Sequence, residues 1–473
     1  MACTHLADRW MAKHTLTLRR LADALCPRFL QGHWERLQAS PLGMRFARGV
    51  FWSLAGAILS RGLALLSSII VARLLGKEGF GELGIIQSTV GMFGTFAGFG
   101  LGVTATKYLA EFRAKDPQKA GRIVALSGVV SWATAGLGSV ALVLSAPWLA
   151  EHTLAAPHLT PLLQWSAGLL FLSVVNGTQT GALSGFEAFR SIAWVNLVSG
   201  LLSFPLLVLG TWACGLPGAV WALTLGTAVN WALSHWALRK EARSGGVPLS
   251  MRGWAEEKDI LWRFSLPLML SITMLVPVNW LCNAILVNQP NGYAEMGILN
   301  AAMQWRALVL FAPTWAGMIG LPILSDLAAR DADAARRVFR MNVALASAAA
   351  AVAALPLMLL SPWLMQAYGP GFGQGHTVLV VVLVGTLFLA FLNVVGQLLI
   401  AAERMWDGLV FAIIQGLATL GATWAFRHYL ALGVAGGQLV AWVLEGALLM
   451  SYIHLLGMRF YRNGSQRCAS RTS

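Results

Sequence analysis

The stretch Val50–Ala72, VFWSLAGAILSRGLALLSSIIVA, determines the fold class. At 1.5 Å per residue, a helix of this length crosses the roughly 30 Å hydrocarbon core of a bilayer. Arg61 is its only charged residue. One arc of the helix is small or polar, and the opposite arc is leucine and isoleucine. The small or polar arc holds Ser53, Gly56, Ala57, Ser60, Ala64, Ser67 and Ser68. The pattern predicts a membrane helix whose polar side faces protein or water.

Similar apolar segments follow along most of the chain. Hydrophobic residues make up 57% of the sequence and charged residues 11%, against about a quarter in soluble domains. The segments are continuously apolar and do not alternate, which excludes a transmembrane β-barrel. We expect helices near residues 50–72, 81–106, 123–146, 161–184, 191–212, 216–238, 264–287, 294–325, 341–365, 376–400, 408–426 and 432–456. The predicted class is an all-α integral membrane protein with about 12 transmembrane helices.

The basic residues predict the orientation of these helices. With the N-terminus in the cytoplasm, the inner segments carry 29 Lys and Arg residues and the outer loops carry 3. Such an imbalance places both termini inside. The net charge of +14 therefore reflects topology, and we expect no nucleic acid partner.

Two parts of the chain resemble each other. Gly79–Ile85, GFGELGI, and Gly292–Ile298, GYAEMGI, each open a predicted helix. A D-x-x-x-A-x-R pattern follows each helix, beginning at Asp116 and at Asp331. These matches predict a parallel repeat of six plus six helices. The predicted division is a basic cytoplasmic leader over 1–49, a six-helix lobe over 50–238, a cytoplasmic linker over 239–263, a second lobe over 264–456 and a cytoplasmic tail over 457–473. The leader is predicted to be a poorly ordered extension, with an interfacial helix as the alternative.

Motifs of catalysis do not occur in the sequence. It contains no G-x-S-x-G, H-E-x-x-H or P-loop pattern, so we expect neither an enzyme nor an ATP-driven pump. The five cysteines are scattered outside metal-binding spacings. We therefore predict no catalytic residue, no metal and no cofactor.

Three ionisable residues lie inside predicted helices, where charge is costly and marks an interior or a wet cavity. Arg61 lies at the edge of the polar arc of its helix, and Arg306 lies on a face of small residues. Each is interpreted as an anion-binding or as a structural arginine, and the anion-binding interpretation is favoured for Arg306. Glu445 is interpreted as the partner of an intramembrane arginine or as a proton or cation site.

Neutral amides also recur inside the helices. Their side chains suit sugar hydroxyls, but hydrogen bonds between helices are the favoured interpretation for each amide taken alone. The candidates for the cavity are Asn279, Asn283, Asn300 and Gln304. Pro267 and Pro277 predict a bent helix with a gating role, or a fixed kink.

Several motifs resemble one known family. They are ARLLGKEGFG at residues 72–81, GFGLG at 98–102, KYLAE at 107–111 and YGPGF at 368–372. In this order they resemble the polysaccharide-exporter flippases, the O-antigen and exopolysaccharide branch of the multidrug/oligosaccharidyl-lipid/polysaccharide superfamily. The resemblance spans roughly residues 45–456.

This resemblance implies two six-helix lobes around a central cavity in the bacterial inner membrane. It implies an undecaprenyl-diphosphate oligosaccharide as cargo, flipped from the inner to the outer leaflet, with membrane lipid and polysaccharide polymerase or export machinery as partners. Arginine forks suit a diphosphate. The alternative is a multidrug-type, cation-coupled antiporter with the same lobes and a more acidic or aromatic cavity. A membrane glycosyltransferase or polymerase is disfavoured because the outer loops are short.

Overall fold

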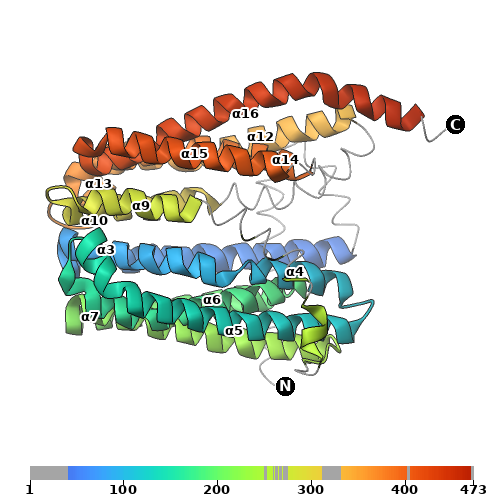
Figure 1. Cartoon of the computed structure of the whole chain (residues 1–473), viewed down its shortest axis with the longest axis horizontal. Coiled ribbons are helices and arrows are strands. Elements are labelled where there is room, and N and C mark those ends of the chain that lie inside the picture. Colours follow the sequence, from blue (N-terminus) through green and yellow to red (C-terminus); the bar gives the residue numbers. More distant parts are fainter. Residues whose placement is uncertain are drawn as a thin grey trace. The chain divides into compact units, whose positions relative to one another are not determined.

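The computed structural model describes residues 41–249, 253–258, 260–261, 265, 269, 275–311, 332–401 and 405–469. These residues contain helices and no strands (Figure 1). The helices are α3 (Pro41–Gly98), α4 (Leu101–Phe112), α5 (Pro117–Trp148), α6 (Thr160–Gly185), α7 (Phe189–Ser244), α9 (Leu275–Val287), α10 (Gly292–Val309), α12 (Ala332–Leu359), α13 (Ser361–Gln366), α14 (His376–Ala401), α15 (Met405–Ala425) and α16 (Leu430–Ala469). The chain divides into two units, Met1–Gly56 and Ala57–Ser473. All contacts described below lie within the second unit.

Eight helical stretches of the described residues are long and apolar enough to cross a membrane. They are Leu59–Gly98, Pro117–Thr153, Pro157–Gly185, Phe189–Ser244, Phe339–Leu359, Gly373–Gly396, Asp407–Ala425 and Arg427–Tyr452. Helices α3 and α7 each comprise two helices, because the backbone leaves helical geometry at Gly76 (φ 70°) and Gly215 (φ 60°). The protein is therefore an all-helical, multi-pass membrane protein. The count of twelve helices in two lobes stays a prediction.

Several predicted boundaries are wrong. The helix expected over 81–106 ends at Gly98, because Phe99 (φ 47°) and Gly100 (φ 65°) take left-handed conformations, and α4 begins at Leu101. The segment expected over 341–365 is divided into α12 and α13, and Pro362 occupies the first turn of α13. The expected helix 294–325 is described only as far as residue 311.

Helices extend into three of the predicted non-membrane segments, and the division of the chain into leader, lobes, linker and tail stays a prediction. Helix α3 begins at Pro41, so the last residues of the predicted leader are helical, and residues 1–40 lie outside the described part. Helix α7 continues to Ser244, past the predicted start of the linker, and α16 continues to Ala469, into the predicted tail. Apolar patterning identifies the membrane span and not the polar turns that extend a helix beyond it.

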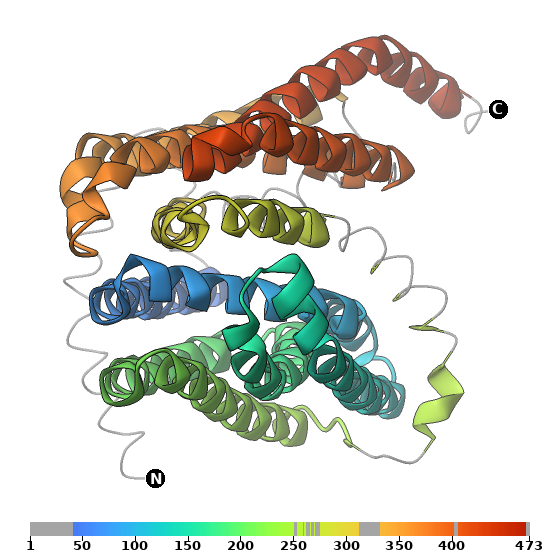
Figure 2. The ribbon, with the colours of Figure 1, turned by 60° about the vertical axis from the view of Figure 1, so that its left-hand side comes forward.

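The helices pack mainly against neighbours in the chain. Helix α6 lies between α5 and α7 and also packs on α4, and α14 and α15 both pack on α16 (Figures 1 and 2). Small residues permit the close contacts typical of membrane helices. At the contact of α4 with α6, Thr106 Oγ1 donates to the carbonyl oxygen of Gly181 at 2.8 Å.

The two repeated motifs lie against each other. A Cβ atom on Gly81 would collide with the carbonyl oxygen of Tyr293, and one on Gly297 would collide with the carbonyl oxygen of Lys77. The backbones of α3 and α10 therefore approach more closely than any side chain would allow. The motifs predicted from sequence to be equivalent thus form one contact between two distant parts of the chain.

Two of the family motifs also meet. Arg73 Nε donates to the carbonyl oxygen of Ala367 at 2.7 Å. The ring of Phe80 lies 6.1 Å from that of Tyr368 and 6.2 Å from that of Phe372, centroid to centroid. These two motifs therefore pack α3 against the turn that precedes α14.

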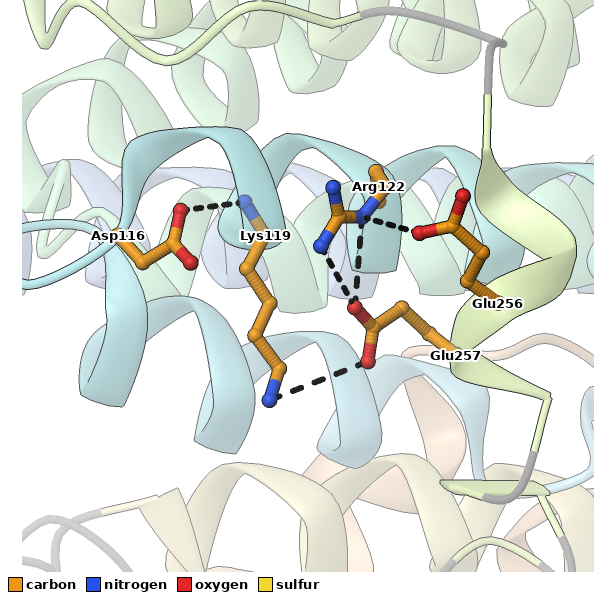
Figure 3. A network of polar contacts seen from close by, with 5 residues as sticks. All are labelled: Asp116, Lys119, Arg122, Glu256 and Glu257. Carbon is orange, nitrogen blue, oxygen red and sulfur yellow. Dashed lines mark hydrogen bonds and ion pairs between the residues drawn. The ribbon is translucent and has the colours of Figure 1, made fainter.

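Residues 253–258 of the predicted linker are fixed to the start of α5 (Figure 3). Asp116 caps α5 by accepting a hydrogen bond from the backbone N–H of Lys119 at 2.9 Å. On the same helix, Arg122 Nη2 lies 3.1 Å from Glu257 Oε1, and Arg122 Nε lies 3.8 Å from Glu256 Oε2. This part of the linker is therefore attached to α5 by ion pairs.

Candidate functional site

A cavity lies between α3, α6, α7 and α10. It consists of two adjoining parts of about 330 and 340 Å³ that share Ser203, Leu207, Leu223 and Asn230. We call the two parts together the polar chamber. Its remaining lining residues are Ser60, Ala64, Ser67, Ser68, Val71, Phe80, Leu83, Gln87, Ser173, Asn176, Gly177, Asn196, Ser199, Gly200, Phe204, Ala222, Gly226, Thr227, Asn300 and Gln304.

The lining of the polar chamber is hydroxyl, amide and apolar. None of the described residues that line it is acidic or basic. Among the buried polar atoms of the lining, Ser199 Oγ and Asn176 Oδ1 have no hydrogen-bond partner in the described part of the chain. Unpaired buried polar atoms are costly, so they indicate a place for water or for a polar ligand.

The polar arc of the first predicted helix faces this chamber. Ser60, Ala64, Ser67 and Ser68 all contribute to the lining. Leu59 and Leu66, from the opposite arc, are exposed on the outer surface of the unit. The predicted polar arc therefore faces the chamber, whereas the apolar arc is divided between exposed residues and Leu65 and Ile69, which pack against the core.

Arg61 lies at the junction of α3 and α10, one residue beyond Ser60. Its Nη1 atom donates to the carbonyl oxygen of Ala307 at 3.3 Å. Its guanidinium carbon lies 4.9 Å from the centre of the Phe311 ring. The side chain is exposed and carries donors beyond the one used on Ala307, so it can contact an anion beside the chamber.

Arg306 is directed toward the C-terminal helices. Its Nη1 atom donates to Gln438 Oε1 at 3.1 Å, and its guanidinium carbon lies 5.8 Å from the centre of the Trp442 ring. Gln438 Nε2 in turn donates to Asn279 Oδ1 at 3.2 Å. Together these bonds connect α10, α16 and α9. The two guanidinium groups thus have different contacts, because Arg61 of α3 contacts Ala307 and Phe311 whereas Arg306 of α10 contacts α16, and neither lines the polar chamber in this conformation.

The four candidate amides take two different positions. Asn300 and Gln304 line the polar chamber. Asn279 belongs to the Arg306 connection, and Asn283 Nδ2 donates to Ser88 Oγ on α3 at 2.9 Å. The first pair is therefore available to a ligand, whereas the second pair joins helices.

The remaining candidates lie away from the chamber. Glu445 on α16 is partly buried, and no ion pair joins it to Arg61 or Arg306 in the described part of the chain. Pro277 lies in the first turn of the described α9, and Pro267 lies outside the described residues. A gating role for these prolines stays a prediction.

The polar residues of α7 were not identified from sequence. Asn196, Ser199 and Ser203 recur at helical spacing on one face of α7 and line the chamber. Gln438 was also missed as the partner of Arg306. The sequence contained a signal in both cases. The polar residues of α7 recur at helical spacing, and Gln438 lies two turns before Glu445 on the same stripe of its helix.

A polar chamber between the helices of a multi-pass membrane protein is a feature of membrane transporters, and the comparisons with known proteins assign the chain to this class. Residues 46–328 match the sequence family described as "Polysaccharide biosynthesis protein", and the chain belongs to this family. The match confirms the resemblance to the polysaccharide-exporter flippases that the motifs had indicated.

Known proteins show the same relationship. The chain is 24% identical over 420 residues to the EPS I polysaccharide export inner membrane protein EpsE of Ralstonia solanacearum, covering 87% of this chain and 90% of EpsE. Its fold resembles an inward-facing multidrug resistance MATE family transporter of the MOP superfamily, with a TM-score of 0.75, 16% identity and coverage of 85% and 95%. It also resembles the lipid II flippase MurJ in an inward closed conformation, with a TM-score of 0.64, 14% identity and coverage of 86% and 87%.

Proposed function

We propose that this protein flips an undecaprenyl-diphosphate-linked oligosaccharide from the inner to the outer leaflet of the bacterial inner membrane by alternating access. The polar chamber carries the proposal. A glycan presents many hydroxyl groups, and the serine, threonine, asparagine and glutamine side chains of the chamber pair with hydroxyls as donors and acceptors.

The names of the similar proteins support this cargo. EpsE is described as a polysaccharide export protein of the inner membrane, and MurJ as a flippase of lipid II. The proposed orientation has both termini in the cytoplasm, as the distribution of Lys and Arg predicts. Proteins that assemble or export the polysaccharide are the expected partners.

The diphosphate requires positive charge, which the chamber itself lacks. We assign it to Arg61 and Arg306. Arg61 lies beside the chamber, and the hydrogen bond from Arg306 to Gln438 uses one of the five N–H donors of Arg306. An alternating-access movement of α9 or α16 relative to α10 would release Arg306 from Gln438 and turn it toward the cargo.

Transport of organic cations is the alternative function. Such a cargo favours carboxylates in the cavity, and none of the described lining residues is a carboxylate. The likeness to the MATE transporter concerns the fold, which transporters of different cargo share.

Filling the chamber tests the proposal. A Cβ atom on Gly177 would meet no atom within 4 Å, so Gly177→Leu places a side chain in the chamber without a collision at Cβ. We expect normal protein abundance in the membrane and at least a tenfold loss of exported glycan. The matched control is Gly421→Leu, at an exposed position of α15 with equally open surroundings, which should export normally. Full export by an abundant Gly177→Leu protein would remove the chamber from the cargo pathway.

A further inference from the structure

A second cavity lies on α5, α6 and α7, away from the polar chamber. Its volume is about 970 Å³. Small and apolar side chains of α5 and α6 form much of the wall, among them Ala125, Gly128, Val175 and Ala182. The segment Gly246–Leu249 closes one end. We call this cavity the α5–α7 groove.

One basic stripe of α7 lines the groove. His235, Arg239 and Arg243 are spaced four residues apart and therefore lie on the same face of the helix, and all three contribute to the lining. Arg239 and Arg243 are exposed near the end of α7, at Ser244. The positive charge thus lies at the end of the groove where the membrane span ends.

The two arginines have no carboxylate partner in the described part of the chain. The acidic residues nearby are occupied elsewhere: Glu241 accepts a hydrogen bond from Ser191 at 2.6 Å, and Glu256 and Glu257 pair with Arg122 (Figure 3). Other basic residues of this region are paired, as Arg113 is with Glu187 at 2.7 Å. The charge of the stripe is therefore available to an external anion.

Aromatic rings close the opposite end of the groove. Trp132 lines it and packs edge-to-face on Phe171, with ring centres 5.1 Å apart, and on Trp231, at 6.4 Å. The ring of Trp231 stacks on His235 at 5.7 Å. From Arg243 to His235 the lining follows about 12 Å of α7, at 1.5 Å per residue. It thus has a basic mouth and a largely apolar interior, in which the hydroxyl and amide side chains of Ser131, Thr178 and Gln179 lie among the small and apolar residues and Trp132.

We infer that the α5–α7 groove binds an anionic glycerophospholipid, with the phosphate at Arg239 and Arg243 and an acyl chain along α5 and α6. Basic pockets between membrane helices on the cytoplasmic side select anionic headgroups, and the predicted orientation places these arginines on that side. The amphipathic form of the groove matches a lipid that has both a charged end and an apolar chain. The site is separate from the polar chamber and does not depend on the identity of the cargo.

Native mass spectrometry of the purified full-length protein tests the inference, with phosphatidylglycerol and phosphatidylcholine as probes. We expect a preference for phosphatidylglycerol that falls about tenfold or more in the double variant Arg239→Gln, Arg243→Gln. Gly128→Leu should also reduce retention of the lipid, because a Cβ atom there meets nothing within 4 Å and the side chain would fill the groove. Lys240→Gln is the matched control, since Lys240 lies on the same turn but contacts Trp236 and does not line the groove. It should behave as wild type.

Four outcomes would overturn the inference. The first is equal retention of phosphatidylglycerol by the wild type and the double arginine variant, and the second is equal loss in Lys240→Gln. The third is a combined result, in which inorganic phosphate at millimolar concentration displaces the lipid and Gly128→Leu retains as much lipid as the wild type. That result would define a simple anion site. The fourth is displacement by undecaprenyl diphosphate at equimolar concentration, which would assign the groove to the carrier lipid. A photoactivatable phosphatidylglycerol should crosslink to residues 124–132, and crosslinks confined to other helices would count against the groove.

Discussion

Two arginines inside apolar helices have different surroundings in this protein. Arg61 and Arg306 are both arginines inside apolar helices, yet Arg61 is exposed beside the chamber and Arg306 contacts Gln438 and Trp442. The sequence identified both because charge in lipid is rare and costly. It could not distinguish their surroundings, because the partner of Arg306 lies 132 residues away in the chain.

Substitution of Arg306 separates cargo binding from a structural role. If the assignment of the diphosphate holds, Arg306→Gln is as abundant in the membrane as the wild type but exports at least tenfold less glycan, because the fork that matches phosphate oxygens is lost. Arg306→Lys retains the charge and part of the export. Glycan export at the cell surface, normalised to protein in the membrane, is the measurement.

Arg61→Gln provides the comparison with Arg306→Gln. In the described part of the chain, the hydrogen bond of Arg61 is to a backbone carbonyl and not to a side chain. The Arg61→Gln variant should lose export without losing abundance. Full export by both glutamine variants would remove the arginines from the mechanism.

The ion pair between Arg122 and Glu257 predicts a difference between two neighbouring glutamates. The Glu257 side chain is 12% exposed and that of Glu256 is 68% exposed, while both lie near Arg122. Breaking the less exposed pair leaves a partly buried guanidinium without its partner, so Glu257→Gln should destabilise the protein by about 1–2 kcal/mol, and Glu256→Gln by less than about 0.5 kcal/mol. Thermal unfolding in detergent, followed by size-exclusion chromatography, measures both. Equal effects would contradict the assigned pairing.

Among the helices, most of the spans were predictable, and their interruptions were not. Continuous apolar runs identified α6, α14 and α15 to within three residues at each end, whereas α5 begins six residues before its predicted start. The break between α3 and α4 was missed because Gly98–Gly102 is as apolar as the helices around it, and only the left-handed backbone at Phe99 and Gly100 reveals it. The hydropathy of a segment indicates whether it lies in lipid or in water, but it does not indicate where the backbone leaves helical geometry.

The close approach of α3 and α10 predicts a strict requirement for glycine. Gly81→Ala and Gly297→Ala each place a Cβ atom against a backbone carbonyl, which cannot move without displacing its helix. Overpacking of this kind typically costs about 1–3 kcal/mol, so both variants should unfold at lower temperature. Gly91→Ala is the control on α3, since a Cβ atom there meets nothing within 4 Å. An unchanged thermal transition in Gly81→Ala would contradict the reciprocal contact of the two motifs.

Helix α9 connects both groups of helices, which makes it the predicted moving element. Asn283 bonds Ser88 on α3, and Asn279 bonds Gln438 on α16, so a movement of α9 must exchange at least one of these bonds. Single cysteines along 275–283 in an otherwise cysteine-free protein should change in reactivity toward a water-soluble thiol reagent when lipid-linked oligosaccharide is added. Positions on the exposed outer face of α15, such as Leu417, serve as the control and should not change. An invariant pattern on α9 in protein that exports glycan would exclude the gating role.

For the molecule as a whole, composition and the order of motifs were sufficient to place the chain in its family, and the match over residues 46–328 agrees with them. The position of the polar chamber was only half predictable. Asn300, Gln304 and the polar arc near Arg61 were found, whereas the contribution of α7 requires knowing which helices surround the cavity. Amides that line the chamber and amides that join helices have the same signature in sequence, as Asn300 and Asn283 demonstrate.

The central claim is that this chain itself moves a lipid-linked oligosaccharide across a bilayer, with the polar chamber as the glycan pathway. The most direct measurement uses purified protein reconstituted into vesicles that carry a fluorescent undecaprenyl-diphosphate oligosaccharide in both leaflets. A membrane-impermeant glycosidase outside the vesicles then reports how much of the glycan becomes accessible with time. We predict that wild-type vesicles expose nearly all of the glycan, whereas vesicles with Gly177→Leu stop at about the half that faced outward at the start. Equal plateaus for wild-type and protein-free vesicles, in the presence of correctly folded protein, would contradict the account.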